Sequence, residues 1–179
     1  ARLEAPWSAR LELIAKRKAP VLGASEFANL DERLPRVPTS VSDLGHRDSE
    51  PFEGLLRYPL TPTLSPPGEG AAVVLVTLGA LSESRARVGF ATGFFGAGGL
   101  RVRESTKDEK SDVACICGTD ERYAAEAVTR VKAVKAAGCK RVYLAGRPGA
   151  LEADLKAAGI DGFIFMGCDV VATLKEVLS

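Results

Sequence analysis

The sequence predicts an α/β fold in which helices cover both faces of a parallel sheet, and three observations support this prediction. Apolar runs alternate with segments of helical periodicity from residue 71 to the end of the chain. The first run, AAVVLVTL (71–78), is almost entirely apolar, as expected of a strand that is covered on both sides. Short links join the successive elements, which is typical of parallel strands with helical crossovers.

After the first strand, a helix is expected over 83–98, because its apolar residues recur at helical spacing. A second, weaker strand pattern follows at 99–105, and a third strand is expected at 112–117. Four glycines lie at the far end of the helix, where they predict a cap and a turn rather than a phosphate-binding loop: Gly93, Gly96, Gly98 and Gly99.

The clearest helix is expected over 119–138, with Thr119 as N-cap and Gly138 as the stop signal. Its predicted buried stripe consists of Ala124, Ala127, Val128, Val131 and Val134. The remaining pattern predicts a strand at 140–146, a helix at 147–159, a strand at 161–167 and a helix at 168–179.

Five such strands favour the flavodoxin-like order 2-1-3-4-5, in which the switch point lies between the first and third strands. Only the segment STKDEK (105–110) joins the second strand to the third, and it is too short for a crossover helix. We therefore expect one crossover helix to be missing.

The amino-acid composition changes upstream of this domain (71–179). Residues 1–57 are polar and irregular, which predicts an N-terminal arm or connector with a short helix at 10–19. Residues 58–70 are rich in proline and glycine, which predicts a linker or an insertion.

Charge and cysteine content exclude several classes of function. Lys and Arg number 24 against 23 Asp and Glu, so no overall field attracts nucleic acid or an anionic membrane. No apolar stretch reaches the length of a membrane span, and no signal peptide opens the sequence. The four cysteines form no C-x-x-C pair, so we expect buried thiols, no metal site and a cytoplasmic location: Cys115, Cys117, Cys139 and Cys168.

Loops beyond the carboxyl ends of the strands are expected to form the ligand-facing edge. They contain only small and polar residues, which we predict to be a possible pocket rim: Gly79, Ser82, Ser84, Gly118, Thr119 and Gly146. Neither serine has a local base to activate it, and Glu83 is expected to be a helix-start residue. The single histidine, His46, lies in the N-terminal arm. No catalytic residue is therefore predicted.

Three stretches carry a family resemblance. They are TLGALSESRARVGFATGFFGAGGL (77–100), VACICGTDERYAAEAV (113–128) and the segment from KAAGCKRVYLAGRPG to TLKEVL (135–178). They resemble the C-terminal domain of the methylmalonyl-CoA mutase family, and most of all its non-catalytic small subunit. RLELIAKRKAPVLGASEFANLDE (10–32) and SEPFEGLLR (49–57) resemble the connector that precedes this domain in the family.

The resemblance also locates the cofactor loop. Cobalamin-binding members carry Asp-x-His-x-x-Gly after the first strand, where the histidine binds cobalt and the aspartate orients it. The corresponding residues here are Leu81, Glu83 and Ala86. None of them can take over its role, so the resemblance implies a degenerate cobalamin loop and no cofactor bound by this chain.

The resemblance implies a fragment of a small-subunit-like protein whose role is structural. Its partner in a heterodimer would be the cobalamin-dependent large subunit, which interconverts methylmalonyl-CoA and succinyl-CoA. Two alternatives remain open: a cobalamin-binding module without a histidine ligand, or a stand-alone flavodoxin-like domain for another small ligand. A truncated or decaying copy of the family's sequence is also compatible with the insertion and the missing helix.

Overall fold

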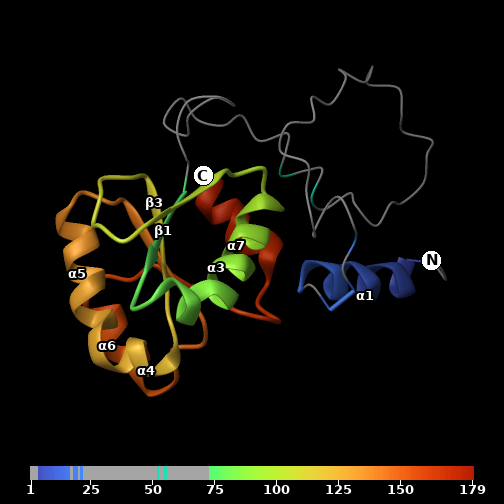
Figure 1. Ribbon diagram of the computed structural model, residues 1–179. Helices are drawn as coiled ribbons and strands as arrows, with labels where there is room; N and C mark the ends of the chain where they lie inside the picture. Colours follow the sequence, from blue (N-terminus) through green and yellow to red (C-terminus); the bar gives the residue numbers. More distant parts are fainter. Residues whose placement is uncertain (1–3, 17, 20, 22–51, 53–54, 56–72) are drawn as a thin grey trace.

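The structure, a computed structural model, describes residues 4–16, 18–19, 21, 52, 55 and 73–179 (Figure 1). Its centre is one parallel sheet in the order β2-β1-β3-β4-β5, which confirms the predicted flavodoxin-like fold. The strands are β1 (Val73–Thr77), β2 (Val102–Ser105), β3 (Val113–Cys117), β4 (Arg141–Ala145) and β5 (Gly162–Ile164).

Two of the inner strands, β1 and β3, are buried at every position, because helices cover both faces of the sheet. On one face lie α3 (Leu81–Gly96) and α7 (Val170–Leu178) (Figure 1). The opposite face carries α4 (Asp120–Arg122), the π-helical segment η1 (Tyr123–Ala127), α5 (Val128–Ala136), the 3-10 segment η2 (Gly149–Leu151) and α6 (Glu152–Ala157). Within the described part of the chain, no helix is long and apolar enough to cross a membrane.

Alternate residues of each strand divide the core into two clusters, as the pleat requires. Leu75 and Cys115 point toward α3 and α7, whereas Val76 and Ile116 point toward α5. Cys115 and Cys117 therefore share one face, and both thiols are buried. Glycine ends α3 as the sequence predicts: Gly99 has a φ of +75°, and the amide of Leu100 returns to the Phe95 carbonyl.

The helix predicted over 119–138 forms, but its predicted buried stripe is wrong at one position. Thr119 caps it as expected, since its side chain accepts a hydrogen bond from the Arg122 amide. The segment η1 has π-helical geometry. Tyr123, four residues before the buried Ala127, is buried in place of Ala124, which is exposed.

The arm upstream of the sheet contributes to the core as well. Helix α1 (Glu4–Ala15) begins and ends earlier than the helix predicted over 10–19. Its Ile14 is buried in the same cluster as residues of α7, together with Phe52 and Leu55. The predictions for the linker at 58–70 and for His46 lie outside the described residues.

The segment that joins β2 to β3 contains no helix, as the sequence predicts. Ser105 at the end of β2 pairs with Val76, whereas Val113 at the start of β3 pairs with Val73 on the other side of β1. Neighbouring strands lie about 4.8 Å apart, so the sideways step is about 10 Å. An extended residue spans about 3.3 Å, so residues 106–112 can make this crossing without a helix.

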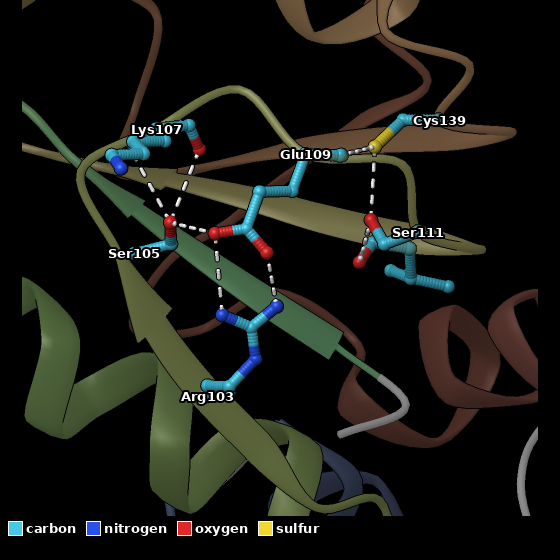
Figure 2. A network of polar contacts seen from close by, with 7 residues as sticks. Arg103, Ser105, Lys107, Glu109, Ser111 and Cys139 are labelled. Atoms are coloured by element: carbon cyan, nitrogen blue, oxygen red, sulfur yellow. Dashed lines mark hydrogen bonds and ion pairs between the residues drawn. The ribbon is translucent and has the colours of Figure 1, made fainter. Parts of the chain in front are cut away.

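Polar contacts hold this helix-free connection in place, as Figure 2 shows. The Glu109 carboxylate accepts hydrogen bonds from the Arg103 guanidinium and from Ser105 Oγ, which lies 2.7 Å away. Farther along, the Cys139 thiol donates to the Glu109 carbonyl oxygen and lies 2.9 Å from Ser111 Oγ. Side-chain contacts thus take the place of the missing helix at this edge.

We predict that replacing Glu109 weakens the fold in a pH-dependent way. Hydrogen bonds from Arg103 and then Ser105 lower the pKa of Glu109 to about 2. Its contribution is therefore present above the ordinary carboxyl pKa of about 4.5 and is lost as the pH falls toward 2. Glu109→Gln should have a slightly lower melting temperature than the wild type at pH 7, and the difference should vanish near pH 2.

Thermal unfolding followed by circular dichroism at several pH values measures this difference. Glu104→Gln is the matched control, because Glu104 is exposed on β2, next to Arg103, and its replacement makes the same change of charge. Parallel pH profiles for the two variants would contradict the assigned role of Glu109.

Candidate functional site

The candidate site lies at the carboxyl end of the sheet, between β1 and β3. From β1 the chain turns into α3 on one face, and from β3 it turns into α4 on the other face (Figure 1). Loops diverge in opposite directions at this point, which is where open α/β sheets generally bind their ligands.

The three residues of the predicted cofactor loop all lie at the start of α3 and on its outer side. Leu81 is half exposed, at 51%, and Ala86 is exposed. Glu83 is already engaged, since its Oε2 accepts a hydrogen bond from Arg122 Nε at 3.0 Å. The Glu83 carboxylate raises the pKa of the Arg122 guanidinium, so Arg122 remains charged at neutral pH.

The predicted rim residues differ in accessibility. Gly79 and Ser82 are exposed, and Thr119 is half buried and caps α4. Ser84 is fully buried, and its hydroxyl donates back to the Leu81 carbonyl. Gly118 and Gly146 are buried too, so three of the predicted rim residues offer no side chain to a ligand.

Two arginine side chains that sequence reasoning missed occupy this end of the sheet. A Cβ atom at Gly79 would lie 2.5 Å from Arg122 Nε, and one at Gly146 would lie 2.5 Å from Arg87 Nη1. Real side chains do not approach so closely, so each glycine makes room for a guanidinium group. The sequence carries one signal of this arrangement: Glu83 and Arg87 are four residues apart on α3 and share a face.

Arg87 is held by several groups at once. Its Nη1 donates to the Ala145 carbonyl at the end of β4 (3.1 Å), and its Nη2 donates to Asp120 Oδ1 (2.8 Å). The guanidinium carbon lies 5.9 Å from the centre of the Tyr123 ring, within the range of a cation–π contact. Arg87 thereby joins α3 to β4 and α4.

Tyr123 covers the same carboxyl end of the sheet from the face that carries α4 and α5. Its hydroxyl accepts a hydrogen bond from the Gly118 amide (2.9 Å) and lies 2.8 Å from the Ala145 carbonyl and 3.3 Å from that of Ile116. The single hydroxyl proton goes to the nearer oxygen, that of Ala145. Burial raises the pKa of Tyr123 well above its ordinary value, so the phenol remains a donor at neutral pH.

A shallow hollow of about 350 Å³ remains beside these contacts, on the β4–β5 side of the closed switch point. Arg147 stacks over the Phe165 ring there, 5.0 Å from its centre, and Met166 is 64% exposed. Arg87 and Asp120 form its other wall.

The described residues offer neither a metal site nor an activated nucleophile. They contain no group of three or more His, Cys, Asp or Glu side chains that could hold a metal ion. Burial raises the pKa of the Cys115 thiol, which keeps it protonated and inert.

This combination defines the class: a flavodoxin-like α/β domain whose ligand-binding edge is closed by its own side chains. No protein-family model matches the chain. It is 34% identical to the methylmalonyl-CoA mutase small subunit of Streptomyces virginiae, over 99% of this chain and 30% of that protein. It is 31% identical to the small subunit of Propionibacterium freudenreichii subsp. shermanii, over 98% of this chain and 30% of that protein.

A probable small subunit of Mycobacterium bovis is 35% identical over 95% of this chain and 29% of its own length. The chain is therefore similar, over nearly all of its length, to one segment of the methylmalonyl-CoA mutase small subunit, which confirms the predicted resemblance. It spans about 30% of the length of the curated relatives that it matches.

We predict that the Tyr123 hydroxyl stabilises the closed edge. Tyr123→Phe leaves the ring in place but removes the partner of the buried Gly118 amide, which should cost about 1–3 kcal/mol of unfolding free energy. Urea denaturation measures the loss. Tyr143→Phe is the control, because it removes the hydroxyl of another buried tyrosine, which lies on β4 with its ring against Phe95. Equal losses in the two variants would contradict the prediction.

Proposed function

We propose that this chain is a structural segment of a methylmalonyl-CoA mutase small subunit and binds no cobalamin. In this proposal it supports a cobalamin-dependent large subunit that interconverts methylmalonyl-CoA and succinyl-CoA. The observation that carries the proposal is the pair formed by Glu83 and Arg122: the residue at the position of the cobalt ligand is a carboxylate, and it is occupied by a neighbouring guanidinium.

The surroundings of that pair support the absence of cobalamin. A histidine-ligated cobalt needs an imidazole, a carboxylate to orient it, and space for the nucleotide tail. Leu81 has no acceptor for an imidazole proton. Space in front of Gly79 is taken by Arg122, and space in front of Gly146 is taken by Arg87. The residues at this edge therefore do not fit a histidine-ligated cobalamin.

A partner and a compartment belong to the same proposal. The matched relatives are named small subunits, which favours assembly of this chain with a large subunit as a heterodimer. All four cysteines are free thiols, which favours the reducing cytoplasm.

A stand-alone small-ligand domain is the second candidate, and one observation favours it. The hollow between Arg147, Phe165 and Met166 is large enough for part of a small molecule and carries an exposed guanidinium. Because this hollow is open and shallow, it supports a ligand-binding function less strongly than the closed cofactor loop supports a structural one.

The proposal predicts that the purified chain retains no cobalamin. After incubation with hydroxocobalamin, gel filtration should separate the protein completely from the corrin absorbance. A cobalamin-binding large subunit run under the same conditions is the positive control. Corrin that co-elutes with this chain in a fixed ratio would disprove the proposed absence of the cofactor.

Association with a large subunit is the second expectation. When a tagged form of this chain is expressed together with a large subunit of the family, the two should co-elute as one complex at micromolar concentration. A tagged flavodoxin-like domain from outside the family serves as the control bait. A large subunit that elutes alone would favour the stand-alone candidate.

A further inference from the structure

We propose that Arg87 and Arg122 determine the specificity of this edge by filling the ligand space themselves. The inference rests on the proposed function and deepens it: loss of the loop motif is one barrier to a ligand, and the two guanidinium groups are a second, independent barrier. Neither arginine belongs to the three positions of the degenerate loop.

The steric part of the argument comes from the two glycines. At Gly79 an added Cβ would lie 2.5 Å from Arg122 Nε and 2.6 Å from Glu83 Oε2. At Gly146 it would lie 2.5 Å from Arg87 Nη1 and 3.2 Å from Tyr123 Cε2. A glycine at a strand end can let a bound ligand approach the backbone closely. Here the chain's own cations fill it.

The two arginines also connect elements that lie on opposite faces of the sheet. Arg122 on α4 reaches Glu83 on α3, and Arg87 on α3 reaches Asp120 on α4. The contacts thus cross the switch point in both directions. A bound ligand would have to break both to enter between the loops.

These contacts differ in strength. The side chains of Arg122 and Glu83 are 44% and 40% exposed, so solvent screens their attraction and the pair is weak. Arg87 is held better, because it also donates to the Ala145 carbonyl and lies over the Tyr123 ring. Arg87 is therefore expected to be the firmer of the two barriers.

Because Arg87 is held more firmly than Arg122, restoring the cofactor motif alone does not clear the ligand space. The triple variant Leu81→Asp, Glu83→His, Ala86→Gly removes the partner of Arg122 but leaves the contacts of Arg87 with Ala145 and Tyr123 intact. Restoring the loop should therefore be insufficient for corrin binding while Arg87 remains.

A thermodynamic cycle tests the occupied space directly and needs neither cobalamin nor a partner. Gly146→Ala is introduced into the wild type and into Arg87→Ala, and melting temperatures are compared. If Arg87 fills the space, the loss caused by Gly146→Ala should fall by roughly half or more when Arg87 is absent. The remaining loss reflects the backbone, whose φ of +155° stays unfavourable for alanine.

Gly149→Ala is the matched control, because Gly149 also has a positive φ (+54°) but no atom lies within 4 Å of its added Cβ. Its cost should be the same in both backgrounds. Arg87→Gln, which keeps most of the stem, provides a second background should Arg87→Ala not fold. An unchanged cost of Gly146→Ala in the folded arginine variant would overturn the proposal.

Corrin retention gives a second, separate measurement. The triple loop variant is incubated with hydroxocobalamin and passed through gel filtration, with and without Arg87→Ala and Arg122→Ala. Retention that appears only when both arginines are replaced would support the proposal, and retention by the triple variant alone would overturn it. Retention by the wild type would instead overturn the proposed absence of cobalamin, whatever the outcome of the cycle, so the two failures are distinguishable.

Discussion

The carbonyl oxygen of Ala145, at the end of β4, is the acceptor on which the closed edge depends. It receives one hydrogen bond from the Tyr123 hydroxyl and another from Arg87 Nη1. Tyr123 comes from the helical segment on one face of the sheet, and Arg87 comes from α3 on the other. A single strand-end carbonyl thus joins both helical layers, and its two lone pairs are satisfied without a ligand or solvent.

Tyr123, which reaches that carbonyl, belongs to a π-helical segment. The sequence analysis placed Ala124, three residues before Ala127, in the buried stripe. Tyr123, four residues before Ala127, is buried in its place, and Ala124 is exposed. Both spacings fit one face of a helix, so the helical period alone does not choose between the two side chains. Strand order, by contrast, follows from apolar runs and link lengths, and these were readable from the sequence.

The helix-free connection between β2 and β3 likewise combines one feature that the sequence predicts with another that it does not. Its length alone predicts that no crossover helix is present. How the exposed edge is then covered depends on contacts between residues distant in space, such as the thiol of Cys139 with the Glu109 carbonyl. These contacts involve ordinary polar residues with no recognisable spacing. A missing element can therefore be predicted from a sequence, whereas its replacement has to be observed.

The candidate site extends this reasoning to the carboxyl ends of the strands. The loop positions Leu81, Glu83 and Ala86 could be located from the sequence, but the closing residues Arg87 and Arg122 lie outside the loop motif and act through space. The two apolar clusters that form the core run along the strands and under the helices, and neither contains these arginines. Tyr123 and Ala145, which contact Arg87, do belong to these clusters, so the closing contacts are anchored on the core. Because the closing contacts also join the two helical layers, the closed edge has a structural use of its own, and this use gives a reason for the edge to remain closed.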